Sequence, residues 1–139
     1  MKITFCGHGD VFYDENIANK LYSILTEKIN TGTNIFYLGG YGNFDLLCAS
    51  LLKNIKKIYP HIKIIFVAPY INKCFNNQLY DESVYPPLEN IPFKFAITYR
   101  NKWMVENADC IICYVKHDWG GAFKTFKYAK KLNKEIIEL

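Results

Sequence analysis

Short apolar runs alternate with longer amphipathic stretches along this chain, and this alternation constrains the fold more than any other feature. Runs of strand length occupy residues 3–6, 34–38, 62–68, 110–115 and 135–139, and residues 93–97 form a further short strand or extended segment. Strands that alternate with helices favour a parallel sheet, because neighbouring parallel strands need a crossover connection. The sequence therefore predicts the α/β class, with an open parallel sheet of about five strands and helices on both faces.

Helical periodicity fills the intervals between these runs. It predicts helices near residues 17–29, 43–58, 98–107 and 121–132. Asp14 and Asn43 stand at the start of the first two helices and are expected to act as N-caps. Residues 70–92 are the least regular stretch, in which we expect a partly helical excursion around residues 72–80 and then a loop. Excursions of this kind often cover a site.

Length and composition indicate one domain over residues 1–139, large enough for a single core. No run approaches the ~20 apolar residues of a membrane-spanning helix, and the N-terminus lacks the pattern of a signal peptide. We therefore expect a cytoplasmic protein without a membrane partner. The five cysteines lie mostly in apolar runs, which is typical of buried reduced thiols. Cys110 and Cys113 would point to opposite faces of a strand and no second cysteine pair is present, so a zinc site is not expected. No other metal or cofactor is expected either.

The glycines are distributed unevenly with respect to the strands. Seven of the eight fall just after a predicted strand: Gly7, Gly9, Gly39, Gly40, Gly42, Gly120 and Gly121. In open parallel sheets, ligands bind outside the carboxyl ends of the strands. Glycine at that edge lets a ligand approach the backbone closely. The asymmetry favours a binding edge over ordinary turn chemistry.

Gly120 and Gly121 separate an apolar strand from a lysine-rich helix. This arrangement places free backbone N–H groups and the positive end of a helix dipole at one point, which is typical of a phosphate site. Arg100, at the start of the preceding helix, is a candidate bidentate partner for the same anion, and Asn101 is expected to orient that loop. Lys124 lies one turn along the helix, where contact with the anion and an exposed position are equally compatible with the pattern.

The loop from Gly39 to Gly42 forms a second possible cradle. Asp45 sits in the first turn of the following helix, where the dipole stabilises an acid, and it is also a candidate to hold a ribose hydroxyl or an opposing loop. His8 follows the first strand and is a candidate phosphate donor or general acid, although a lone loop histidine is usually neither.

Other polar and aromatic residues flank the second glycine pair. His117 and Asp118 form a possible acid–base couple, but adjacent residues seldom point into one site. Trp119 and Tyr41 are possible platforms for a base, and core packing or surface cover explains them equally well.

Several segments together resemble the SLOG superfamily, named for the Smf/DprA and LOG (Lonely Guy) proteins, which includes small bacterial Rossmann-like proteins. The resemblance is carried by residues 5–8, 38–45, 67–70, 99–105, 108–109, 120–121 and 128–129, and it covers nearly the whole chain. It implies a three-layer Rossmann-like sheet. It also implies a nucleotide or nucleotide-derivative site formed by the glycine loops and the R-N-x-x-M helix.

The LOG enzymes of this superfamily cleave the base from a nucleoside 5′-monophosphate, with a motif similar to P-G-G-x-G-T-x-x-E after an Arg-x-x-Met segment. Here Arg100 and Met104 are separated by one residue more, and Gly120 and Gly121 match the glycine pair. The third glycine and the glutamate are missing, and Ala122 stands where many small members carry threonine. The resemblance therefore implies phosphate on the N–H groups of Gly121 and Ala122 but argues against LOG-type hydrolysis.

These observations predict a protein that binds a nucleotide or nucleotide-derived phosphate ligand, in a sensor or regulatory role. The alternative is an enzyme that hydrolyses or transfers a nucleotide N-glycosidic bond through Asp45 or Asp118. A single-stranded nucleic-acid module is ranked last, because the net charge of +4 is diffuse and no contiguous basic patch interleaved with aromatics is evident on one element. The resemblance also suggests a homodimer through the outer helices.

Overall fold

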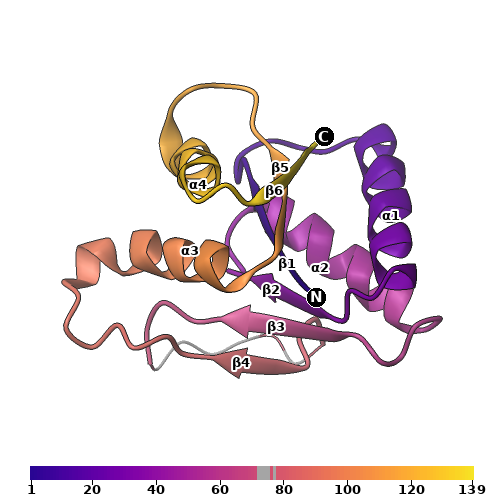
Figure 1. Cartoon of the computed structure of the whole chain (residues 1–139), viewed down its shortest axis with the longest axis horizontal. Helices are drawn as coiled ribbons and strands as arrows, with labels where there is room; N and C mark the ends of the chain where they lie inside the picture. Colours follow the sequence, from indigo (N-terminus) through magenta and orange to yellow (C-terminus); the bar gives the residue numbers. More distant parts are fainter. Residues whose placement is uncertain (72–75, 77) are drawn as a thin grey trace.

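The structure, a computed structural model, describes residues 1–71, 76 and 78–139. Its strands form one sheet in the order β4-β3-β2-β1-β5-β6, and every neighbouring pair is parallel (Figure 1). The strands are β1 (Lys2–Gly7), β2 (Ile35–Leu38), β3 (Lys63–Val67), β4 (Glu82–Val84), β5 (Cys110–Tyr114) and β6 (Glu135–Glu138). The helices are α1 (Glu15–Asn30), α2 (Asn43–Lys56), the 3₁₀ turn η1 (Phe93–Phe95), α3 (Ala96–Asn107) and α4 (Gly120–Lys131).

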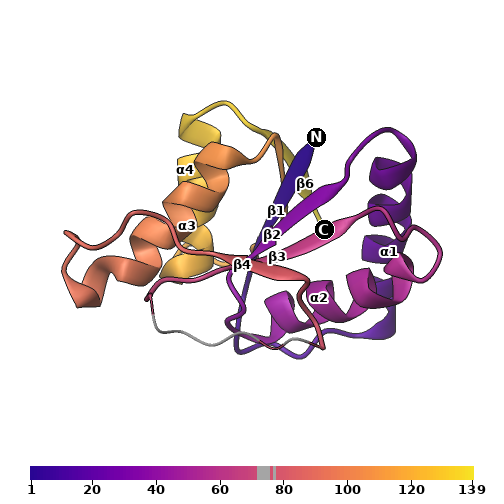
Figure 2. The same ribbon diagram turned by 90° about the horizontal axis from the view of Figure 1, so that it is seen from below.

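The sheet is the middle of three layers. Helices α1 and α2 cover one face, and α3 and α4 cover the other (Figures 1 and 2). Ile3 and Ile112 belong to the apolar cluster beneath α1 and α2, whereas Ile111 packs with Val105 and Ala129 beneath α3 and α4. The predicted α/β sheet with helices on both faces is confirmed, with six strands in place of about five.

Strand β4 was missed by the sequence analysis, which expected a loop there. It is a three-residue edge strand whose Glu82 is exposed, so it lacks the apolar run that marks a buried strand. Asp81 holds it in place, because its carboxylate accepts a hydrogen bond from the Ile64 amide at 2.8 Å while its own amide donates to the Ile64 carbonyl. The helical excursion expected around residues 72–80 falls largely on residues 72–75 and 77, outside the described part of the chain.

The expectation of a strand or extended segment over residues 93–97 was wrong. Pro92 precedes η1, and the chain passes directly into α3 at Ala96. Two residues of the apolar run that suggested a strand are exposed here, since Phe93 is 75% and Phe95 46% accessible. A short apolar run alone was therefore a poor guide to a strand.

The two expected N-caps had different outcomes. Asp14 caps α1, and its side chain accepts a hydrogen bond from the Ile17 amide at 3.0 Å. At α2 the cap position belongs to Gly42, whose φ of 90° favours glycine, and Asn43 is the first helical residue. The Asn43 side chain donates instead to the Val11 carbonyl, so it fixes the loop that follows β1.

The cysteines that the structure describes are buried and free. Cys110 lies beneath α1 and α2 and Cys113 beneath α3 and α4, so they point to opposite faces as the strand period predicted. Cys6 and Cys113 face each other across β1 and β5 with their sulfur atoms 3.0 Å apart. This contact with Cys113, together with burial, raises the pKa of the Cys6 thiol and keeps it protonated.

The strand order also shows where the direction in which successive strands are added to the sheet reverses. From β1 the chain adds β2, β3 and β4 on one side and returns to add β5 and β6 on the other. The carboxyl ends of β1 and β5 therefore flank the switch point, where open α/β sheets form a crevice.

Among the helices that the structure describes, none has the length and apolar content needed to span a membrane.

Close packing at the end of β1 yields a stability prediction. A Cβ atom at Gly7 would lie 2.3 Å from the ring of Phe44, which is 1% exposed. We expect Gly7→Ala to lower the free energy of unfolding by about 1–3 kcal/mol, because the ring has no room to move. Urea denaturation measures this change.

Gly121→Ala is the matched control, since a Cβ atom there meets nothing within 4 Å. It is expected to change the unfolding free energy by less than about 1 kcal/mol. Equal stability of Gly7→Ala and the natural protein would show that Phe44 does not pack against β1 as described.

Candidate functional site

A pocket of about 250 Å³ opens at the switch point between β1 and β5. The end of β1 and the loop after it contribute Gly7 and His8, and the first turn of α4 contributes Gly120, Gly121 and Ala122. Helix α3 and the segment that leads into α2 also contribute to the lining. The topology thus brings together residues separated by more than a hundred positions in the chain, as the carboxyl ends of parallel strands require.

Arg100 is the buried cation of this pocket and is 2% exposed. Its Nη1 donates to the carbonyls of Gly39 at 2.9 Å and Val67 at 3.0 Å, and its Nε donates to the Asn101 side chain at 2.9 Å. A guanidinium has five N–H donors, so both on Nη2 are left, and they form no hydrogen bond to any residue that the structure describes. Burial lowers the pKa of Arg100, and Asp45 counteracts that shift. An anion in the pocket would satisfy the Nη2 donors.

The first turn of α4 supplies a second set of donors. Trp119 occupies the cap position without a side-chain hydrogen bond, and the first turn contains no acidic residue. Gly120 has a φ of 90°, and a Cβ atom at Gly121 would meet open space. The N–H groups of this turn are therefore uncapped by any side chain and lie beside the pocket, where the helix dipole favours negative charge.

Asp45, from the first turn of α2, lines the same pocket. Its carboxylate accepts a hydrogen bond from the Tyr41 amide at 3.1 Å. Burial raises the pKa of Asp45 to about 6, against the opposing effects of the Tyr41 amide, Arg100 and the amides of Gly39 and Gly40. The amides of the loop between β2 and α2 thus interact with the carboxyl group of Asp45.

The glycines of that loop serve internal packing. A Cβ atom at Gly39 would lie 2.8 Å from the Arg100 guanidinium carbon, and one at Gly40 would lie 2.5 Å from the Phe66 ring. One at Gly42 would lie 2.5 Å from the Gly9 backbone. The residues proposed for this second cradle, Gly39, Gly40, Gly42 and Asn43, do not line the pocket.

Three rings stack along the mouth of the pocket. The His8 and His117 rings are 3.8 Å apart, and the His117 and Trp119 rings are also 3.8 Å apart, each pair nearly parallel. Trp119 is 64% exposed, and Tyr41, also in the lining, is 73% exposed. Exposed aromatic faces beside a pocket are suited to stacking on a planar base.

His8 has a structural role within this stack. Its Nε2 accepts a hydrogen bond from the Lys116 amide at 2.9 Å, which requires an unprotonated Nε2. Burial, followed by the neighbouring His117, lowers the pKa of His8 and favours the neutral ring. His8 therefore ties the loop after β5 to the end of β1, and its Nε2 is not available as a donor to phosphate.

Two further candidates from the sequence lie outside the pocket. Asp118 is exposed and borders a shallow surface depression near Phe123, so it does not form a couple with His117 in the main pocket. Lys124 lines a smaller adjoining pocket between α3 and α4. Among the described residues, no cluster of three or more His, Cys, Asp or Glu side chains could hold a metal ion.

Sequence reasoning missed several residues that line the pocket. Asp10, Ile97 and Thr125 belong to it. Thr125 carries a signal, because it lies one helical turn after Gly121. Met104, which the resemblance placed in the R-N-x-x-M helix of the site, also lines the pocket. The Thr125 hydroxyl donates to the Gly121 carbonyl at 2.9 Å and so holds the first turn of α4.

Comparison with known proteins identifies a shared fold. No protein-family model and no curated protein sequence matches the chain. A structure of DNA processing protein A from Helicobacter pylori, reported for its single-stranded DNA binding mode, has a TM-score of 0.69 and 14% identity over 99% of this chain. The Moco carrier protein of Chlamydomonas rheinhardtii has a TM-score of 0.58 and 16% identity, covering 99% of this chain and 74% of that one.

The chain spans 64% of the length of the DNA processing protein A that it matches. At these identities the likeness concerns the fold alone.

The raised pKa of Asp45 yields a pH prediction. The folded protein holds this proton up to about pH 6, whereas an ordinary aspartate with a pKa of 3.8 releases it earlier. Between these values the folded state binds more protons, so stability falls as the pH rises. Relative to Asp45→Asn, we expect the natural protein to lose about 2–3 kcal/mol of unfolding free energy from pH 4 to pH 7.

Urea denaturation of both proteins at several pH values measures this difference. Asp118→Asn, which removes an exposed carboxylate outside the pocket, is the control. A constant difference between Asp45→Asn and the natural protein across this range would mean that Asp45 is an ordinary surface acid.

Proposed function

We propose that the pocket between β1 and β5 binds a nucleotide or a nucleotide-derived phosphate ligand. One observation carries this proposal: the two unused donors of the buried Arg100 and the uncapped first turn of α4 lie in the same pocket. The Nη2 donors of Arg100 have no partner among the described residues, and a phosphate would accept hydrogen bonds from both sets of donors at once. The exposed ring of Trp119 then offers a surface for the base.

A sensor or regulatory role agrees best with the polar groups present. The glutamate that the LOG motif places after the glycine pair is missing, and the Nε2 of His8 is occupied by the Lys116 amide. The remaining groups bind and orient a ligand without an evident nucleophile and base. The resemblance of the sequence to the SLOG superfamily supports this function.

A ligand titration tests the proposal directly. We expect nucleoside 5′-monophosphates to raise the melting temperature and to give measurable heats in calorimetry, whereas the corresponding nucleosides bind at least about tenfold more weakly because they lack the anion. A pocket that prefers the nucleoside, or that binds neither, would contradict the proposal.

A matched pair of variants at Gly121 separates charge from size. In Gly121→Asp a carboxylate would occupy the first turn of α4, where the dipole stabilises it and preserves the fold. It would also repel the phosphate, so we expect binding to weaken at least about tenfold relative to Gly121→Asn, which has the same size without the charge. Equal affinities of the two variants would place the phosphate elsewhere.

Arg100→Ala is a less informative variant. It would leave the carbonyls of Gly39 and Val67 without their donor, so a loss of stability of about 2–4 kcal/mol would accompany any loss of binding. The Gly121 pair avoids this complication, because position 121 faces open space.

A second candidate function is hydrolysis or transfer at a nucleotide N-glycosidic bond. The observation in its favour is Asp45, a carboxyl group in the pocket whose pKa of about 6 suits proton transfer near neutral pH. Water would add to the anomeric carbon while the base departs with a proton, leaving the sugar phosphate. Chromatography of nucleoside monophosphates incubated with the protein tests it: release of base that Asp45→Asn abolishes would favour the enzyme over the sensor.

Single-stranded nucleic acid is the third candidate. Helicobacter pylori DNA processing protein A, which has a similar fold, is reported for its single-stranded DNA binding mode. This observation speaks against ranking nucleic acid as an improbable partner. Anisotropy of a labelled oligonucleotide at two salt concentrations distinguishes it, since binding through phosphates weakens steeply with salt.

A further inference from the structure

A small second pocket adjoins the first between α3 and α4. Its volume is about 40 Å³, and it shares Asn101, Gly121 and Thr125 with the main pocket. Lys102 from α3 and Lys124 from α4 complete it on the outer side. Because Gly121 lies in both linings and carries no side chain, nothing at that residue separates the two spaces.

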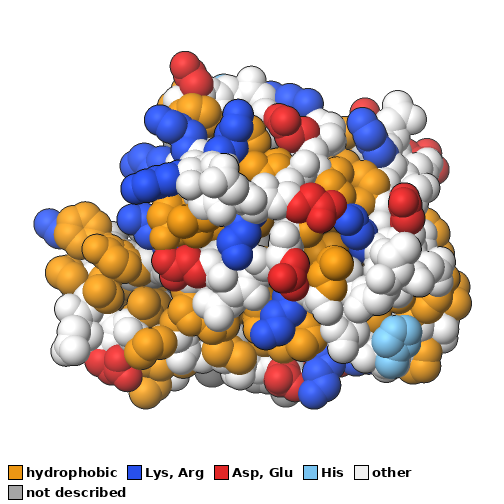
Figure 3. All heavy atoms as spheres, viewed as in Figure 1, with side chains coloured by type: hydrophobic (Ala, Val, Ile, Leu, Met, Phe, Trp, Pro, Cys, Tyr) orange, Lys and Arg blue, Asp and Glu red, His pale blue; other side chains and the backbone are white. Residues whose placement is uncertain are grey.

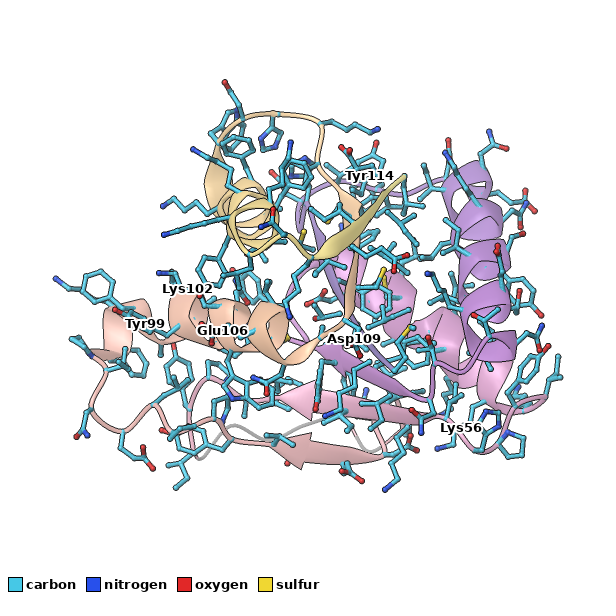
Figure 4. All side chains as sticks on the ribbon, in the orientation of Figure 1. Lys56, Tyr99, Lys102, Glu106, Asp109 and Tyr114 are labelled. Atoms are coloured by element: carbon cyan, nitrogen blue, oxygen red, sulfur yellow. The ribbon has the colours of Figure 1, made fainter. Side chains whose placement is uncertain are left out.

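The two lysines come from different helices and converge on this small pocket. Lys102 lies on the side of α3 toward α4, with its Nζ 5.3 Å from the Tyr99 ring centre and 5.4 Å from that of Tyr128 (Figure 4). Basic side chains also gather over α4 on this face of the molecule (Figure 3). The local potential is therefore positive.

Neither lysine is neutralised by an ion pair within the described ranges of the chain. Glu106, one turn after Lys102 on α3, accepts a hydrogen bond from the Tyr128 hydroxyl at 2.5 Å. That bond directs the acid toward Tyr128, and both ammonium groups keep free donors. Two cations from neighbouring helices form an environment suited to a phosphoryl group.

We propose that this small pocket is a second phosphate subsite and that the ligand is a nucleoside diphosphate or another nucleotide with a pyrophosphate. The inference rests on the function proposed above and extends it to the number of phosphates. The first phosphoryl group contacts Arg100 and the start of α4, and the chain of phosphates then passes over Gly121. The second phosphoryl group lies between Lys102 and Lys124.

The test compares the mono- and diphosphates of the four ribonucleosides by calorimetry, without divalent cations. For the preferred base we expect the diphosphate to bind about tenfold more tightly, since each partly exposed charge pair contributes a few-fold. We also expect this advantage to shrink when the salt is raised from about 50 to about 200 mM, because screening weakens exposed charge pairs.

Variants of the lysines locate the effect. Lys102→Gln with Lys124→Gln is expected to reduce the affinity for the diphosphate to that for the monophosphate and to leave the monophosphate within about twofold. Lys127→Gln is the matched control, because it removes one positive charge from an exposed position on the same helix that lines neither pocket. It should change neither affinity by more than about twofold.

The outcomes separate the two proposals. Equal affinities for mono- and diphosphates overturn the second subsite and leave the nucleotide site intact. A loss of diphosphate affinity in Lys127→Gln as large as in the double variant also overturns it, because the effect would then come from general charge. Failure of every nucleotide to bind overturns both.

Discussion

Burial of the Arg100 guanidinium is the constraint on which the rest of this edge of the protein depends. One nitrogen binds the carbonyls that follow β2 and end β3, so a single side chain from α3 joins these strands on their pocket side. Burying a guanidinium group costs free energy unless its N–H groups form hydrogen bonds. Gly39 is glycine because a side chain there would collide with the guanidinium. The remaining nitrogen, Nη2, forms no hydrogen bond to any residue that the structure describes.

Two helix N-termini lie at this edge of the sheet, and they differ in what contacts them. At the start of α2, the Asp45 carboxylate accepts a hydrogen bond from the Tyr41 amide, and the amides of Gly39 and Gly40 also stabilise its charged form. The start of α4 has no acidic residue and no side-chain cap. A dipole satisfied internally stabilises the loop, whereas one left open is available to a ligand. The two glycine loops look alike in the sequence but differ in what faces them.

Much of the fold was predictable because it depends on local periodicity. The apolar run of β5 and the cap at Asp14 identify their elements without tertiary information. Strand β4 was not predictable in this way, since its place is decided by pairing with β3 and by the Asp81 side chain. Residues 93–97 gave the opposite error, because their short apolar run suggested a strand although Phe93 and Phe95 are exposed on η1.

By itself, the sequence determined an α/β fold with a glycine-rich edge, since strand and helix periods and the residues that break them are local properties. Only the tertiary structure decided which glycines line the pocket. Gly39, Gly40 and Gly42 are needed for internal contact, whereas Gly121 faces open space. That distinction depends on atoms distant in the chain, because a close approach between two segments is not encoded in either segment alone.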